Sequence, residues 1–243
     1  MSKRINLSII TDSEFSVVVV FGDTISKDIF EAIMGFNAAL LQSPFPGFIE
    51  TVPAYTTLTV FYDPSLVLAA NNLAGDYAFT RVIGYLNKLA GVYRPIVSDD
   101  VEPVIIPVCY GGRFGPDIEE VATHNHISIS QLIGLHTAPI YIVYMLGFMP
   151  GFPYLGGMDE KLETPRHHSP RKNVPAGSVG IAGKQTGIYP FTSPGGWQLI
   201  GRTPLKLFDA AAGSPTLLRP GARVKFEPMT AAAFDESIKH EAV

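Results

Sequence analysis

Hydrophobic positions in residues 1–94 repeat with the two periods that characterise strands and helices. Ile29, Ile33 and Leu40 fall on one face of a helix, and Gly91 stands where a second helix should end. Helices that alternate with antiparallel strand pairs predict a small α+β domain of the ferredoxin-like type. The expected strands are Ile5–Ile10, Ser16–Phe21, Phe48–Tyr55 and Thr57–Tyr62, and the expected helices are Ser26–Leu41 and Ala78–Leu89.

From residue 95 onward, short apolar runs are separated by Gly and Pro turns. Two short helices are expected where Asp117 precedes Glu120 and where Ser128 precedes Gln131, because both pairs have the spacing of a capping box. Many short strands with turn punctuation favour a closed or nearly closed β-barrel. We therefore predict a mainly β domain over 95–230, followed by a polar, alanine-rich tail at 231–243 that frays. The expected strands are Val101–Tyr110, Ile140–Leu146, Ser178–Ala182, Leu199–Gly201, Leu205–Phe208 and Arg223–Glu227.

Composition excludes several classes of protein. The net charge of -4 argues against a dedicated nucleic-acid binder, which normally carries a basic excess. Cys109 is the one cysteine, so no intramolecular disulfide forms, as suits a reducing compartment. The N-terminus lacks the apolar run of a signal peptide, and Pro139 and Gly147 interrupt the most apolar stretch. We expect a cytoplasmic protein that binds neither membrane nor nucleic acid.

Standard catalytic motifs are absent, which narrows the candidate chemistry. The run from Gly177 to Gln185 resembles a phosphate loop, but Gln185 stands where Ser or Thr must bind magnesium. No G-x-S-x-G nucleophile elbow occurs. The pairs His124/His126 and His167/His168 lack a third ligand at a telling spacing, so we predict solvated histidines and no metal site. His136 follows a helical segment and is expected to interact with its C-terminal carbonyls.

The segment from Gly147 to Thr203 combines Gly and Pro punctuation with aromatic and basic side chains. A disordered linker would lack the aromatic residues, so we interpret the segment as ordered loops over a rigid core, where binding and catalysis often reside. Guanidinium groups suit carboxylate or phosphate, although a solvated basic loop is the alternative. The aromatic residues either wall a pocket or pack in the core. The candidate catalytic residues are Arg166, Arg171, Lys184, Gln185 and Arg202, and the candidate substrate-binding residues are Phe148, Pro150, Tyr154, Tyr189, Ser193 and Trp197.

Three stretches of the chain carry a specific resemblance: GFMPGFPYLGGMD, TPRHHSPRKNVPAGSVGIAGKQTGIYP and SPGGWQLIGRTPLKLFD. They closely resemble the family of bacterial 5-oxoprolinase B subunits, which includes the sporulation-kinase inhibitor KipI and is also called allophanate hydrolase subunit 1. The resemblance extends upstream through residues 49–64 and 110–122, and so covers nearly the whole chain. It implies a ferredoxin-like domain followed by a cyclophilin-like β-barrel domain. Arg113 departs from the acid usual in the family's YGGEFGPD-like turn, and His167 and His168 are also unusual.

The resemblance implies a subunit that is inactive alone. The family's complex hydrolyses 5-oxo-L-proline to L-glutamate with hydrolysis of ATP, for which Mg²⁺ is expected. Its partners are a KipA-like subunit, of the allophanate hydrolase subunit 2 type, and a LamB/YcsF-type subunit. A five-membered lactam is a poor electrophile, so cationic groups for phosphate and for developing oxyanion charge would be useful.

Two other functions stay open at this point. The chain could inhibit a histidine kinase as KipI does, through exposed surface rather than through the basic residues. It could instead be a carboxyltransferase-type subunit of a biotin-dependent urea or amide carboxylase, because similar paired domains occur in urea carboxylase. That role would require partner proteins, because this chain has no biotin-carrier segment.

Overall fold

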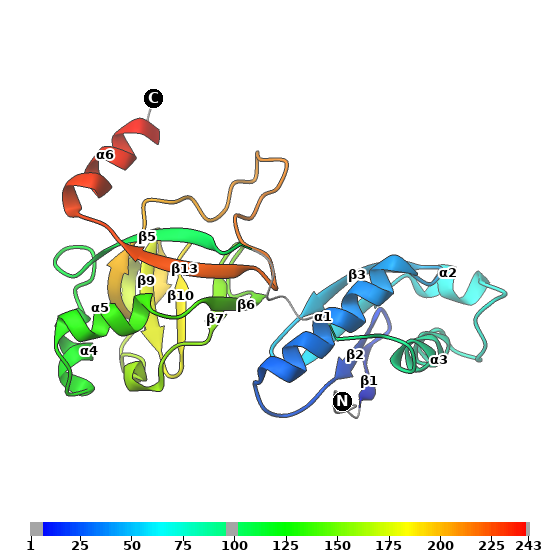
Figure 1. The fold of residues 1–243 in the computed structure, drawn as a ribbon. Coiled ribbons are helices and arrows are strands. Elements are labelled where there is room, and N and C mark those ends of the chain that lie inside the picture. The colour runs from blue at the N-terminus through cyan, green and yellow to red at the C-terminus, as the bar shows by residue number, and fades with distance from the viewer. Residues whose placement is uncertain (1–6, 96–101, 242–243) are drawn as a thin grey trace. The chain divides into compact units, whose positions relative to one another are not determined.

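The structure is a computed structural model that describes residues 7–95 and 102–241, and it falls into two compact units, 1–99 and 100–243. Figure 1 shows the helices and strands of both units, and each unit has its own hydrophobic core. The elements of unit 1 are β1 (Ser8–Ser13), β2 (Ser16–Val20), α1 (Lys27–Gln42), β3 (Phe48–Pro53), β4 (Thr57–Tyr62), α2 (Pro64–Ala69) and α3 (Ala78–Ala90).

Unit 1 is an antiparallel four-stranded sheet with helices packed against its apolar face. Val17, Val19 and Val60 point from the sheet into the core, where they meet the buried faces of α1 and α3. Ser26 caps α1 by accepting a hydrogen bond from the Ile29 amide, so the predicted start of this helix is confirmed. Helix α2 was not predicted from the sequence; in it Pro64 takes the first helical position after the cap Asp63.

The strand order in unit 1 is β1-β2-β4-β3. The ferredoxin-like pattern, β-α-β-β-α-β, places its last strand after the second helix. In unit 1 the described residues after α3 form no strand, and β1 supplies the fourth strand from the N-terminal side. The α+β character is therefore confirmed, whereas the ferredoxin-like assignment stays a prediction.

Unit 2 contains a closed barrel with the strand order β10-β7-β6-β13-β5-β12-β9. The pair β13 and β5 is parallel and the other barrel pairs are antiparallel. The barrel confirms the mainly β prediction for this part of the chain. Its strands are β5 (Val104–Tyr110), β6 (Tyr141–Leu146), β7 (Pro153–Gly156), β9 (Ser178–Ala182), β10 (Gln185–Ile188), β12 (Gln198–Arg202) and β13 (Arg223–Pro228).

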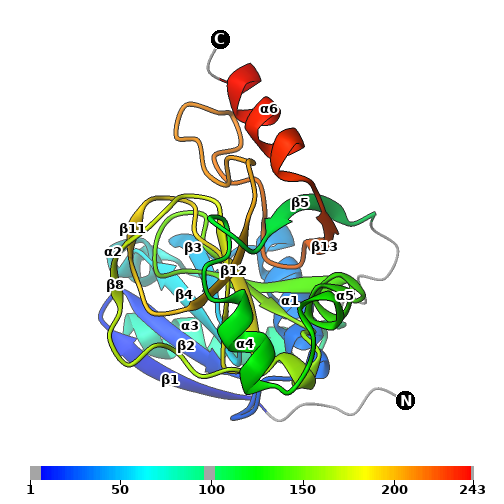
Figure 2. The same cartoon turned by 90° about the vertical axis from the view of Figure 1, so that its left-hand side faces the viewer.

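The remaining elements of unit 2 lie outside the barrel. Helix α4 contacts β12, and α5 contacts β13 (Figures 1 and 2). A separate two-stranded ribbon is formed by β8 and β11. These elements are α4 (Ile118–His124), α5 (Ile129–Thr137), the 3-10 helix η1 (Glu160–Leu162), β8 (Arg171–Val174), β11 (Ser193–Gly195) and α6 (Ala231–Glu241).

Several local predictions for unit 2 were tested by the structure. The capping box of Ser128 and Gln131 is confirmed at the start of α5. The one at Asp117 is wrong, because the Asp117 side chain makes no hydrogen bond to α4 and binds elsewhere. No strand forms over Leu205–Phe208, where Phe208 makes only an isolated bridge to Thr216. The predicted start of the first strand, at Val101, lies outside the described residues.

The expectation that the chain frays after residue 230 is also wrong. Residues 231–241 form α6, whose Phe234 is 1% exposed and packs on Phe114 with ring centroids 4.5 Å apart. Arg113 contributes to this attachment, because its guanidinium pairs with Asp235 on α6 and lies over the Phe114 ring. The residue that departs from the family's usual acid therefore forms a salt bridge within this chain.

His136 lies in the last turn of α5, as expected, but its buried ring bonds to side chains of the barrel rather than to the C-terminal carbonyls of the helix. Its Nε2 lies 3.0 Å from Thr186 Oγ1, and its Nδ1 lies 2.8 Å from Tyr110 Oη. Thr186 Oγ1 donates to the Gly180 carbonyl, so it accepts from His136, and Tyr110 donates to Nδ1. Burial lowers the pKa of His136 to about 3, so the imidazole is neutral at physiological pH.

Candidate functional site

An open cavity of about 290 Å³ lies in unit 2, beside the barrel strands β7, β10 and β12. Its walls are aromatic rings and Gly/Pro turns from segments that are far apart in sequence. This combination is typical of a small-molecule site, in which apolar walls are supplemented by a few polar groups. The lining residues are Phe148, Phe152, Tyr154, Arg166, Pro170, Tyr189, Pro194, Gly195, Gly196 and Trp197.

The aromatic wall is a packed cluster centred on Phe152. The Phe152 ring meets Tyr189 and Trp197 edge to face, with centroids 5.2 and 5.4 Å apart. Phe152, Tyr189 and Trp197 are all nearly completely buried. The sequence left core packing and pocket wall as alternatives for Tyr189 and Trp197, and in the structure these side chains do both.

Close packing of this cluster depends on glycine at position 187 of β10. A Cβ added to Gly187 would lie 3.0 Å from the Phe152 ring, the Trp197 ring and the Pro153 carbonyl oxygen. The absence of a side chain there lets the two rings pack directly over the strand. Gly187 therefore allows the Phe152 and Trp197 rings to pack against β10.

Phe148 sits at the opening of the cavity with a backbone conformation that is unusual for its residue type. Its φ is 68°, and its side chain is 63% exposed while it contacts Phe152 and Tyr189 edge to face. Non-glycine residues rarely adopt positive φ, and such residues cluster at functional sites. An exposed ring held in this way is available to cover a bound ligand.

Arg166 is the one cation among the described residues that line the cavity. Its guanidinium carbon lies 5.7 Å from the centroid of the Trp197 ring, within range of a cation–π interaction. The side chain is thus positioned to bind a carboxylate or another anion against an aromatic wall.

The hydroxyl groups of Tyr154 and Tyr189 stay protonated at neutral pH. Their usual pKa near 10 already ensures this; burial raises the pKa of both groups further, while the charge of Arg166 lowers both to a smaller extent. The Trp197 backbone hydrogen bonds to Tyr189. Protonated phenols donate hydrogen bonds, so either hydroxyl can donate one to a carbonyl oxygen.

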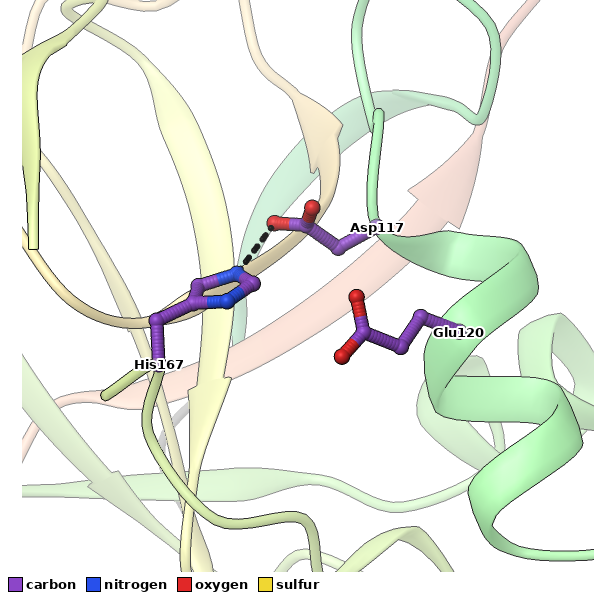
Figure 3. A group of neighbouring side chains, drawn as sticks. All are labelled: Asp117, Glu120 and His167. Carbon is purple, nitrogen blue, oxygen red and sulfur yellow. Dashed lines mark ion pairs between the residues drawn. The ribbon is translucent and has the colours of Figure 1, made fainter. Parts of the chain in front are cut away.

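Next to the cavity, the buried carboxylate of Asp117 accepts several hydrogen bonds. Arg171 binds it with both Nη atoms, one at 2.8 Å, and the Leu199 amide donates to Oδ2 at 2.6 Å. His167 Nε2 lies 3.2 Å from Oδ2 (Figure 3), but its direction does not form a hydrogen bond, and this buried nitrogen has no other partner among the described residues. His167 is therefore largely enclosed, which corrects the prediction that it is solvated.

Asp117, Glu120 and His167 also offer ligand atoms within 4.8 Å of one another (Figure 3). A divalent cation there would need a lone pair of Asp117. Oδ2 already accepts from Arg171 and Leu199, and the positive charge of Arg171 opposes a second cation. This arrangement fits a structural ion pair better than a metal site. The absence of a bound metal is still a prediction from the sequence.

The structure brings some of the predicted site residues together and places others elsewhere. Phe148, Tyr154, Arg166, Tyr189 and Trp197 line the cavity. The other six lie outside its lining. Three are basic: Arg171 pairs with Asp117, the Lys184 Nζ lies 3.9 Å from a carboxylate oxygen of Glu163, and Arg202 donates to the Ala176 carbonyl and lies over the Phe234 ring. Of the others, Gln185 starts β10, Ser193 donates to the Pro194 carbonyl, and Pro150 is in an exposed turn.

Sequence reasoning missed Asp117 as part of this region, because its spacing to Glu120 matched a helix cap. The lining residues that were not candidates are Phe152, Pro170, Pro194, Gly195 and Gly196. The Ser193–Gly196 turn did carry a signal, since its glycines suggest the close approach of a backbone or ligand. The run from Gly177 to Gln185 forms the hairpin of β9 and β10, which confirms that it is not a phosphate loop.

Comparison with known proteins agrees with the resemblance seen in the sequence. The carboxyltransferase domain family, subdomain C and D, matches residues 7–218. The 5-oxoprolinase B subunit of Bacillus subtilis is 46% identical over 226 residues, which cover 93% of each chain. The chain therefore belongs to the family of 5-oxoprolinase B subunits. The 5-oxoprolinase B subunit of Escherichia coli is 56% identical over 187 residues, which cover 75% of this chain and 79% of that one.

A solved structure supports the fold of this family member. The crystal structure of TTHA0988 superimposes with a TM-score of 0.75 at 36% identity, over 89% of this chain and 40% of that longer chain. The cavity residues all lie within the range of the family match. Among the described residues, no helix combines the length and apolar character that crossing a bilayer requires.

Proposed function

We propose that this chain is a subunit of an ATP-dependent 5-oxoprolinase complex, which hydrolyses 5-oxo-L-proline to L-glutamate in the cytoplasm. The observation that carries the proposal is the cavity with an aromatic wall and a single lining cation, Arg166, in a chain whose relatives are named as the B subunits of 5-oxoprolinase. 5-Oxoproline is a small ring with a carboxylate and an amide carbonyl, and each part has a counterpart in this cavity. In keeping with the family, we also propose ferredoxin-like and cyclophilin-like folds for units 1 and 2.

In the proposed mode of binding, the lactam ring lies against Trp197 and Phe152, and its carboxylate pairs with Arg166. The protonated hydroxyl of Tyr154 or Tyr189 donates to the amide carbonyl oxygen, where negative charge develops when water attacks the carbon. Both hydroxyls are protonated at neutral pH, and burial raises the pKa of each further above that range. Phe148 covers the ring from the solvent side.

This cavity supplies binding and electrostatic stabilisation but no base. Its titratable lining groups, among the described residues, are Arg166 and the two tyrosines. None of these accepts a proton at neutral pH, so activation of water requires a group from outside the lining, which we assign to another subunit. The lack of a base supports a site that is completed by another subunit.

The lining of this cavity offers more to a small acid than to ATP. A volume of about 290 Å³ with one lining cation suits a small acid rather than a nucleotide with its magnesium-bound phosphates. We therefore propose that the nucleotide and Mg²⁺ are held mainly by the partners. These are a KipA-like subunit and a LamB/YcsF-type subunit.

The test is co-expression of the chain with both partners, followed by measurement of glutamate released from 5-oxoproline. We expect release that requires ATP and all three subunits. A correctly assembled complex that releases no glutamate would overturn the proposal.

A carboxyltransferase role is the second candidate, because the matching family is described as a carboxyltransferase domain. That role predicts carboxylation of urea or another amide when the chain is combined with a biotin carboxylase and a biotin carrier. Incorporation of labelled bicarbonate, without glutamate release, would favour it.

A further inference from the structure

Two segments form one wall of the cavity, and neither is part of a helix. Residues 164–171 carry Arg166, and residues 193–199 carry Trp197. The segments touch directly, because the His167 amide donates to the Gly196 carbonyl at 2.8 Å and Arg171 pairs with Gly195. The distance between Arg166 and Trp197 thus depends on how these two segments are held.

Asp117 fixes the second segment from outside the cavity. Its amide donates to the Leu199 carbonyl at 2.9 Å, and its Oδ2 accepts from the Leu199 amide at 2.6 Å. Leu199 follows Trp197 closely on the start of β12. The backbone and the side chain of one residue therefore anchor the strand that begins beside Trp197.

The same carboxylate fixes the first segment through Arg171. Both Nη atoms of Arg171 bind it, which is the bidentate geometry that sets orientation as well as distance. Arg171 directly follows Pro170, a lining residue. The Asp117 side chain is only 5% exposed, so water competes little for these bonds.

We propose that Asp117 is a positioning residue: through Arg171 and Leu199 it sets the placement of Arg166 against Trp197. It does not line the cavity and is not a catalytic residue. Arg171 is then the partner of Asp117 rather than a group that contacts substrate. The effect of Asp117 on turnover rests on the proposed function, whereas its effect on the position of Arg166 and Trp197 does not.

Trp197 is the one tryptophan of the chain, so its fluorescence reports on the wall directly. The test compares the wild-type chain with Asp117→Asn, which keeps an acceptor for Leu199 and removes the charge that holds Arg171. We expect the emission maximum to move to longer wavelength and quenching by iodide to increase. The control is Asp235→Asn, which breaks another Arg–carboxylate pair, on α6, and should leave both signals unchanged.

The second readout is the kinetics of the assembled complex with 5-oxoproline. Displacement of a binding group by about 1 Å can lower a rate by about 100-fold, so we expect kcat/KM of Asp117→Asn to fall by roughly tenfold to 100-fold. Asp235→Asn should match the wild type. A wild-type complex that is inactive would refute the proposed function alone, because the fluorescence comparison needs no substrate.

If Asp117→Asn does not fold, the double variant Asp117→Asn/Arg171→Gln replaces it, since two amides leave no unpaired buried charge. The double variant should show the shift of Trp197 emission to longer wavelength relative to the wild type, because it also lacks the link between residues 117 and 171. A folded variant whose emission, quenching and kinetics all equal those of the wild type would overturn the proposal.

Discussion

Replacement of His136 should remove much of the acid sensitivity of unit 2. His136 is fully buried and held neutral between Tyr110 and Thr186, neither of which carries a charge at neutral pH. Protonation would place an uncompensated charge in the interior. The substitution is His136→Gln, which keeps hydrogen-bonding capacity and does not titrate.

The magnitude follows from the pKa of His136, which is about 3 in the folded chain and 6.5 without burial. Because the folded pKa is lowered, the stability that depends on neutral His136 is present above pH 6.5 and is lost as the pH falls towards 3. The full difference corresponds to roughly 5 kcal/mol, at about 1.4 kcal/mol per pKa unit. Between pH 7.5 and pH 5 the expected loss is about 2 kcal/mol.

The assay is urea unfolding followed by Trp197 fluorescence, which reports on unit 2 because unit 1 contains no tryptophan. We expect the wild type to lose about 2 kcal/mol more than His136→Gln between pH 7.5 and pH 5. At pH 7.5 the variant should be less stable by about 1–3 kcal/mol, because its amide does not reproduce the ring geometry with which His136 bonds to Tyr110 and Thr186.

Comparison of the two chains cancels the contributions of other titrating groups. An equal loss of stability in the wild type and in His136→Gln would refute the reasoning. It would show that His136 is not held neutral by burial.

Three further predictions concern the cavity and α6. Gly187→Ala should destabilise unit 2 by about 1–3 kcal/mol and alter Trp197 emission, because the added methyl group meets two rings at 3.0 Å; an unchanged melting temperature would contradict this packing. Phe148→Gly should raise stability by about 1 kcal/mol in thermal unfolding while weakening substrate binding, whereas a drop in stability would show that the ring is mainly structural. Phe234→Ala should release α6, lower stability by about 3–5 kcal/mol and expose the C-terminal residues to protease, while the exposed Ile238→Ala should behave as the wild type.

The secondary structure was predictable where hydrophobic period and local chemistry agreed. The stripe of Ile29, Ile33 and Leu40 with the cap Ser26 gave α1, and the valine run of β2 gave a central strand. The prediction for α6 failed because the alanine-rich segment has one large apolar anchor, Phe234. Its partner Phe114 lies far away in the sequence.

The candidate site was predictable in residue type but not in arrangement. A solvated loop, an internal ion pair and a binding group all look alike in sequence, so Arg166 could not be separated from Arg171 or Lys184. Arg166 lines the cavity only because the segment that carries it meets the Gly195–Trp197 turn. The role of Asp117 could not be predicted for a similar reason, because its partners Arg171 and Leu199 are distant from it in the sequence.

The most direct test of the central claim, that the cavity binds 5-oxoproline through Arg166, is the kinetics of the complex with Arg166→Gln. Loss of a charged partner for the carboxylate predicts a fall in kcat/KM for 5-oxoproline of roughly 10- to 100-fold. The matched variant Lys184→Gln, whose side chain is 68% exposed outside the cavity, should keep the wild-type value. Equal kcat/KM for Arg166→Gln and the wild type would contradict the account.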